Sequence, residues 1–188
     1  DTVLPTGWQV LGTETASADT TWETVWGEER FIRDRHNELT VRLSPLNSKL
    51  SSLNLSIVFR VFNDGFAYRY VFSEQEAEQF TVLDEHSSYT FAQEPQIWSI
   101  PWRTEYYEAL FEKAPLHEKD TMNSPVTLQM ADGSYAFLHE AALTDFPCQN
   151  LYSSSAHQLS TYLTPWMKDD KVIADKAYIT TPFATPWR

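Results

Sequence analysis

The sequence predicts an all-β protein in which antiparallel strands form a sandwich. Short alternating segments are separated by Gly, Pro, Asn, Asp and Ser, and long stretches of helical periodicity are scarce. An Asp-Gly pair lies between two runs of aromatic and β-branched residues, which is a strong hairpin signal. A chain of 188 residues, 42% of them hydrophobic, can bury one sizeable core. We therefore expect one β-sandwich domain over residues 1–178.

The clearest element is a hairpin over residues 55–72 that turns at the Asp-Gly pair, residues 64–65. A two-residue loop at this pair would place Arg60 opposite Arg69, and like charges in that position are destabilising. A three-residue loop with a left-handed glycine instead pairs Arg60 with Tyr68. We favour the three-residue loop. Both faces of the hairpin are apolar, as expected for central strands that are covered on both sides.

The remaining elements are read from shorter patterns. Alternation predicts strands over residues 39–43, 79–83, 88–92, 97–100, 126–130, 135–140 and 159–163. Residues 105–114 contain helix-forming residues and predict one or two helical turns, whereas the polar stretch 114–124 predicts an exposed loop. Two Thr-Pro steps near the end force an extended backbone, so residues 179–188 are expected to form a linker.

Charge and cysteine content exclude several classes of protein. The net charge is −12 and no Lys/Arg run exists, so we expect neither a nucleic-acid partner nor an anionic membrane partner. The single cysteine, Cys148, excludes an intramolecular disulfide and a zinc site built on paired cysteines. No apolar run of about 18 residues is present, as a membrane span would require. The absence of disulfides leaves the cellular compartment open.

His139 and Glu140 stand side by side at the end of an apolar segment, a position that could hold a metal or a sugar. Adjacent residues on a strand point to opposite faces, so the two can share one ligand only if the strand bulges or ends there. One carboxylate is also far short of the six to eight oxygens that calcium takes. The alternative is that Glu140 lies on a solvated edge and His139 is structural.

Other side chains could also act on a sugar. Trp98 and Trp102 are candidate stacking platforms for pyranose rings, although large aromatics mostly serve core packing. Paired carboxylates across a cleft could hydrolyse a glycosidic bond. The remaining acidic candidates are Glu28, Glu29, Glu105, Glu108 and Asp145. No Ser-His-Asp order, phosphate-binding glycine loop or metal-type histidine spacing is present, so the residues alone do not describe a self-sufficient enzyme.

Five motifs, taken together and in order, resemble the N-terminal domain of glycoside hydrolase family 97, and the resemblance covers nearly the whole chain. Each motif alone is weak, but their order and spacing are specific. They are Trp26-Gly27-Glu28, the segment from Phe59 to Tyr70, Tyr107-Glu108, the segment from His139 to Leu143, and Thr185-Pro186-Trp187-Arg188.

The resemblance implies a β-super-sandwich similar to galactose mutarotase, here lacking its first strands, with few short helical turns. It implies that residues 179–188 lead to a catalytic (β/α)8 barrel of the same polypeptide, and that this chain alone is inactive. The family comprises calcium-dependent α-glucosidases and α-galactosidases of the bacterial periplasm or exterior, which act on α-linked oligosaccharides. Glu140 matches the glutamate that joins barrel glutamates around the calcium.

Two other functions stay open at this point. The first is a free-standing carbohydrate-binding module that uses Trp98 and Trp102. The second is an aldose epimerase resembling the mutarotases, which requires a histidine and a glutamate as an acid-base pair in one pocket.

Overall fold

The computed structural model describes residues 7–46, 53–74, 79–103, 108–168, 171–174 and 177–188. Their regular structure is nearly all antiparallel strand, so the predicted all-β sandwich class is confirmed. The chain divides into two compact units. The first contains Asp1–Gln79 and Thr180–Trp187, and the second contains Phe80–Ile179 and Arg188.

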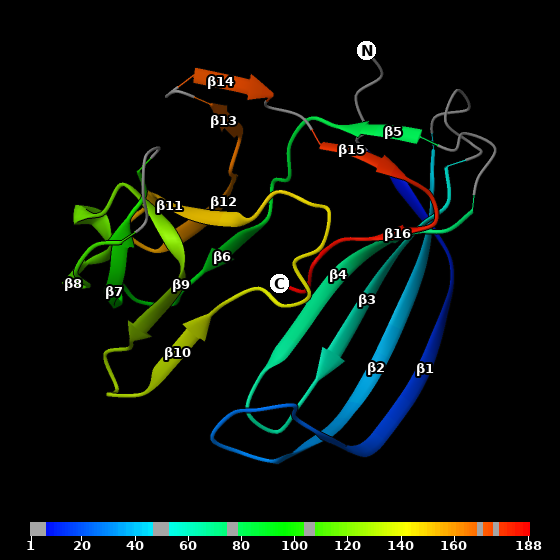
Figure 1. Cartoon of the computed structure of the whole chain (residues 1–188), viewed down its shortest axis with the longest axis horizontal. Coiled ribbons are helices and arrows are strands. Elements are labelled where there is room, and N and C mark those ends of the chain that lie inside the picture. Colours follow the sequence, from blue (N-terminus) through cyan, green and yellow to red (C-terminus); the bar gives the residue numbers. More distant parts are fainter. Residues whose placement is uncertain (1–6, 47–52, 75–78, 104–107, 169–170, 175–176) are drawn as a thin grey trace. The chain divides into compact units, whose positions relative to one another are not determined.

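The first unit holds a five-stranded sheet with the order β1-β2-β3-β4-β16 (Figure 1). Its strands are β1 (Trp8–Glu23), β2 (Phe31–Pro45), β3 (Leu55–Val61), β4 (Phe66–Phe72) and β16 (Phe183–Ala184). The strands β1 and β2 form a long hairpin. The sequence predicted only residues 39–43 of this hairpin, because β1 is rich in threonine, serine and acidic residues and its side chains are mostly exposed.

The hairpin of β3 and β4 has a different register from the predicted one. Arg60 pairs with Ala67, and the Phe62 amide donates to the carbonyl oxygen of Gly65 at 2.8 Å. The loop is therefore Asn63-Asp64, and Gly65 does not have a positive φ. The prediction of a three-residue loop was wrong. Because a one-residue shift moves a whole strand to the opposite face, Arg60 does not pair with Tyr68 as predicted.

The observed register keeps the two arginines of the hairpin apart along a diagonal of one face. Their guanidinium carbons lie over the indole of Trp187, at 4.5 Å for Arg60 and 4.3 Å for Arg69. Arg60 also donates to Glu38 at 2.9 Å. The two arginines do not lie opposite each other in this register, and an aromatic face and a carboxylate lie beside them.

The second unit holds a sheet with the order β6-β12-β11-β9-β7-β8, and β10 pairs with β9 (Figure 1). Its strands are β6 (Ser88–Thr90), β7 (Gln96–Pro101), β8 (Glu112–Pro115), β9 (Thr121–Gln129), β10 (Tyr135–Leu138), β11 (Gln149–Ser155) and β12 (Gln158–Leu163). Two small pairs complete the strands, β5 (Gln79–Val82) with β15 (Ala177–Thr180) and β13 (Trp166–Lys168) with β14 (Lys171–Ala174).

The core of the second unit includes a segment that the sequence assigned to the surface. Residues 114–124 were expected to form an exposed loop, but they contain the end of β8, a 3-10 helix η2 (Leu116–Glu118) and the start of β9. Leu116 is fully buried and Met122 nearly so. Polar residues hid the pattern, because the few apolar side chains that enter the core are widely spaced. The other buried core members are Ile97, Val126, Leu128, Leu151 and Leu159.

The predicted helical turns over residues 105–114 are replaced by strand β8 at their C-terminal end, and residues 104–107 lie outside the described residues. The expected linker, residues 179–188, is held by backbone pairing in its middle. There β16 pairs with β4, and the Thr185 amide donates to the Tyr70 carbonyl at 2.9 Å. The division into a domain and a linker stays a prediction.

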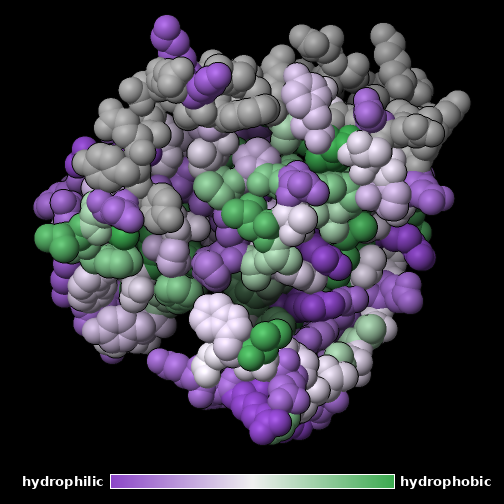
Figure 2. All heavy atoms as spheres, viewed as in Figure 1, coloured by the Kyte–Doolittle hydropathy of each residue, from purple (hydrophilic) through white to green (hydrophobic). Residues whose placement is uncertain are grey.

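Polar and apolar residues are interspersed over the face shown in Figure 2. Within the part of the chain that the structure describes, no helix has the length and apolar character needed to cross a membrane.

Candidate functional site

Glu140 lies just beyond the end of β10 and is buried, with 8% of its surface exposed. The strand ends at Leu138, so His139 and Glu140 lie in the irregular segment that follows it. His139 is exposed, and its ring lies 5.7 Å from that of Phe137. The two neighbours thus lie in different surroundings, because the Glu140 carboxylate is buried and the His139 imidazole is exposed to solvent. This is the reverse of the alternative in which Glu140 lies on a solvated edge.

The backbone after Glu140 takes an uncommon course. Ala142 and Asp145 have φ values of 57° and 51°, in the left-handed region that residues other than glycine rarely adopt. The chain then enters β11 at Gln149, whose amide donates to both oxygens of the Glu140 carboxylate, at 3.1 and 3.2 Å. This return of the chain fixes the carboxylate at the start of a core strand.

Arg188 joins Glu140 to a second buried carboxylate, Glu85. Its Nη1 donates to Glu140 Oε2 at 2.6 Å, while Nε and Nη2 donate to the two oxygens of Glu85 at 3.1 and 2.7 Å. The Arg188 side chain is completely buried, and each glutamate side chain is only 7% exposed. Such a two-pronged contact is the geometry that a guanidinium makes best with a carboxylate. We call these three residues the buried triad.

Further hydrogen bonds surround the buried triad. The Ser87 hydroxyl donates to Glu85 at 2.9 Å. The Gln149 side-chain amide donates to the Thr161 hydroxyl at 2.7 Å and to the Tyr89 hydroxyl at 3.2 Å. Because buried polar groups are costly unless they are satisfied, these contacts stabilise one arrangement of the carboxylates.

The buried triad carries an excess of negative charge when all three groups are ionised, since two carboxylates face one guanidinium. Burial raises the pKa of the Glu140 carboxyl above its ordinary value, while the Arg188 guanidinium and the Gln149 amide oppose part of that rise. A further cation close to Glu140 would favour the ionised carboxylate.

Calcium fits this chemistry as a partial site. A carboxylate offers about four lone pairs, and among the described residues Glu140 Oε1 accepts only the shared bond from the Gln149 amide. Oε1 therefore has capacity for a further partner. The described residues contain no group of three or more His, Cys, Asp or Glu side chains that could hold a metal. Because calcium takes six to eight oxygens, most of its ligands would have to come from elsewhere.

A group of aromatic rings lies on β7, on β10 and just after β10, with Trp98 half-buried and the other rings exposed. Tyr135 and Phe137 on β10 are 62% and 61% exposed. The Trp98 ring on β7 lies 6.1 Å from Tyr135, and the Phe137 ring lies against His139. The register places Trp98 opposite Thr127, and Thr127 opposite Phe137, so these rings share one face. We call Trp98, Tyr135, Phe137 and His139 the aromatic strip.

The other sequence candidates do not join the buried triad. Lys113 Nζ lies 4.4 Å from the ring centroid of Trp98, and Trp102 packs edge to face with Tyr162 at 5.4 Å. The exposed acidic candidates are Glu28, Glu29, Glu108 and Asp145, whereas Glu105 lies outside the described residues.

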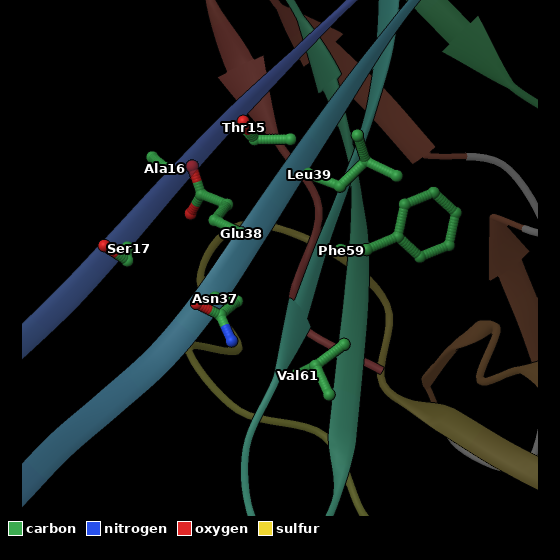
Figure 3. A pocket seen from close by; sticks show the side chains of 8 residues that line it. All are labelled: Thr15, Ala16, Ser17, Asn37, Glu38, Leu39, Phe59 and Val61. Carbon is green, nitrogen blue, oxygen red and sulfur yellow. The ribbon is translucent and has the colours of Figure 1, made fainter.

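A cavity of about 790 Å³ lies on the sheet of the first unit (Figure 3). Its lining comes from Thr15, Ala16, Ser17, Asn37, Glu38, Leu39, Phe59 and Val61. Glu38 is the one ionisable residue in this lining, and it is paired with Arg60. The lining contains no histidine beside a carboxylate, which the epimerase hypothesis would require.

Sequence reasoning missed Glu85, Gln149 and Arg188. Glu85 follows a short strand without any motif, and Gln149 had no signal at all. Arg188 did have a sequence signal, because it is the last residue of the Thr-Pro-Trp-Arg motif. The two Thr-Pro steps, however, predicted an extended linker and not a buried arginine.

Comparison with known proteins identifies the family. The model of the glycosyl hydrolase 97 N-terminal family matches residues 3–188. The chain belongs to this family. A retaining α-galactosidase of Bacteroides thetaiotaomicron is 25% identical in an alignment of 177 residues that covers 85% of this chain and 25% of that protein. A glycoside hydrolase family 97 enzyme of Pseudoalteromonas sp., solved with acarbose, has a TM-score of 0.83 at 26% identity, over 96% of this chain and 27% of that one.

A β-arabinopyranosidase structure shares the fold, with a TM-score of 0.81 at 20% identity, over 96% of this chain and 31% of that chain. The chain therefore spans about a quarter of the length of the relatives first named. These comparisons confirm the family 97 resemblance, and they confirm that the relatives of this N-terminal domain are glycoside hydrolases.

Proposed function

We propose that this family 97 domain packs on a catalytic (β/α)8 barrel of the same polypeptide and contributes Glu140 to a calcium site of an α-glucosidase or α-galactosidase. The barrel carries the catalytic carboxylates, so the domain alone has no hydrolase activity. The substrates are α-linked oligosaccharides, and the enzyme works in the bacterial periplasm or outside the cell. The observation that carries this proposal is a buried carboxylate, fixed from two sides, that keeps one oxygen able to bind a cation.

The aromatic strip supports the packing of a second domain next to Glu140. A monomer rarely exposes large apolar side chains as a contiguous group unless the group forms a contact. Phe137 and His139 lie within three residues of Glu140 in the chain, so a partner domain that reaches the same calcium ion as Glu140 comes close to these rings. The relatives supply the candidate partner, because roughly three quarters of their length lies outside the matched region.

Replacing Glu140 by glutamine in a full-length enzyme carrying this domain tests the calcium assignment. We expect the dissociation constant for calcium to rise at least about tenfold, because one anionic ligand is lost. Glu118→Gln is the matched control, since that glutamate is exposed. Isothermal titration with calcium provides the measurement. An unchanged dissociation constant in Glu140→Gln would refute the assignment.

Replacing Phe137 by serine tests the packing. Its ring is largely exposed in this domain, so the melting temperature of the isolated domain should change little. In a full-length enzyme the same change should lower the melting temperature by several degrees, because covered apolar area is lost. Tyr178→Ser, at a position that is 73% exposed, is the control. Equal small effects in both proteins would contradict packing at this face.

The second candidate is the free-standing carbohydrate-binding module, which the exposed ring of Tyr135 beside Trp98 favours. Titration of the isolated domain with maltooligosaccharides and α-galactosides decides. Millimolar or tighter binding that is lost in Trp98→Ala or Trp102→Ala would support the module, and an absence of binding would remove it.

A further inference from the structure

We propose that Arg188 and Glu85 act as a positioning pair for Glu140, holding its carboxylate in the orientation for calcium while leaving its charge available to the ion. This inference rests on the proposed function of Glu140 as a calcium ligand. It assigns roles to two residues that would act on the metal through Glu140.

The geometry gives each residue a separate part. Glu85 receives two of the three hydrogen bonds from the guanidinium, at 3.1 and 2.7 Å, and Glu140 receives the third at 2.6 Å on Oε2. The charge of Arg188 is thus matched mainly by Glu85. Glu140 is oriented by one N–H on Oε2 and by the Gln149 amide, and Oε1 is the less occupied oxygen.

Charge balance explains why a second carboxylate is needed. A lone arginine beside Glu140 would compete with calcium, because it would neutralise the ligand that the ion requires. With Glu85 present, the ionised buried triad has a net charge of −1, so a cation is still attracted to Glu140. Ligating carboxylates are commonly hydrogen-bonded in turn, and loss of such an outer partner typically costs about 10- to 100-fold in metal affinity.

The first test is Glu85→Gln in the full-length enzyme, measured by isothermal titration with calcium. The amide keeps the shape of the side chain but removes its charge, so Arg188 then faces Glu140 alone. We expect calcium affinity to fall about tenfold or more. Asp19→Asn is the matched control, because Asp19 receives the same two-pronged contact from Arg33, at 2.8 and 2.7 Å, on an exposed surface.

The second test is Arg188→Lys, with Arg33→Lys as its control. Lysine keeps the positive charge but lacks the planar fork that reaches both glutamates at once. We expect calcium affinity to fall about tenfold in Arg188→Lys and to stay unchanged in Arg33→Lys. A purely structural role would lower the melting temperature of the calcium-free enzyme without changing calcium affinity.

The outcomes separate this proposal from the one on which it rests. Weaker calcium binding in Glu85→Gln and Arg188→Lys, together with weaker binding in Glu140→Gln, supports the positioning pair. Unchanged affinity in Glu85→Gln or Arg188→Lys, with weakened affinity in Glu140→Gln, overturns the positioning pair alone. Unchanged affinity in Glu140→Gln overturns the calcium assignment and the positioning pair with it.

Discussion

Replacing Arg188 by methionine should lower the free energy of unfolding of this chain by about 3–5 kcal/mol, the usual cost of removing one partner of a buried ion pair. The guanidinium is completely buried and makes three hydrogen bonds to two carboxylates. Methionine fills much of the same volume, so the loss comes mainly from two buried carboxylates without a cation. Against a typical total of about 5–15 kcal/mol, this is a large share.

Urea denaturation of the chain at pH 7, followed by tryptophan fluorescence, measures this loss. The control is Arg33→Met, which breaks the same two-pronged contact where both side chains are more than half exposed. Exposed pairs contribute only about 0–1 kcal/mol, so the control should unfold nearly like the wild type. A loss below about 1 kcal/mol in Arg188→Met would contradict the buried, fully paired arrangement on which this reasoning depends.

Removing all three charges at once should cost less than removing one. The triple variant Glu85→Gln, Glu140→Gln, Arg188→Met leaves no buried charge without a partner, so we expect it to recover more than half of the stability lost in Arg188→Met. Simple additivity of the single changes would mean that the three groups do not form one network.

Three further predictions concern the same chain. Hydrogen bonds from the His117 backbone amide and ring lower the pKa of Glu94 below its ordinary value of 4.5. Ionised Glu94 therefore stabilises the fold at pH values above 4.5. This contribution is lost as pH falls through the lowered pKa, and the stability advantage of wild type over Glu94→Gln should shrink in denaturation below pH 4.5. Ala142→Gly should raise the urea midpoint, by relief of about 1 kcal/mol from a left-handed position. Leu128→Ala should lower the free energy of unfolding by about 2–5 kcal/mol, because Leu128 is fully buried.

The sequence predicted those strands in which alternation is strong and local. The hairpin of β3 and β4 and the strands β7, β10 and β12 follow from runs of aromatic and β-branched residues. The end of β10 just before His139 was also close to the prediction, because an apolar run stops there. In each case the side chains that decide the structure lie within one short segment.

Features that depend on distant residues were not predicted. In the observed register of the β3-β4 hairpin, Arg60 lies opposite Ala67, and Arg60 and Arg69 both contact Trp187, which is far away in the sequence. The two loops compared from the sequence both included Gly65, whereas the observed loop is Asn63-Asp64. The core position of Leu116 has the same origin, because it depends on packing against strands that lie far away in sequence.

Glu140 shows where residue patterns and tertiary contacts must be combined. Its sequence context suggested a ligand, but a lone carboxylate at a strand end is more often a surface charge. The structure removes that alternative by burying Glu140 between Arg188, 48 residues later in the chain, and the amide of Gln149. No spacing rule connects these positions.

The buried triad is a costly way to stabilise a domain. Replacing a buried ion pair by well-packed apolar residues of similar volume often leaves a protein equally or more stable. This triad also has two carboxylates for a single guanidinium. Stability alone therefore explains the arrangement poorly. Under the proposed function, a cation bound by Glu140 would balance the charge of the second carboxylate. On this argument calcium should stabilise a full-length enzyme more than it stabilises its Glu140→Gln variant, and equal increases in melting temperature with calcium would contradict it.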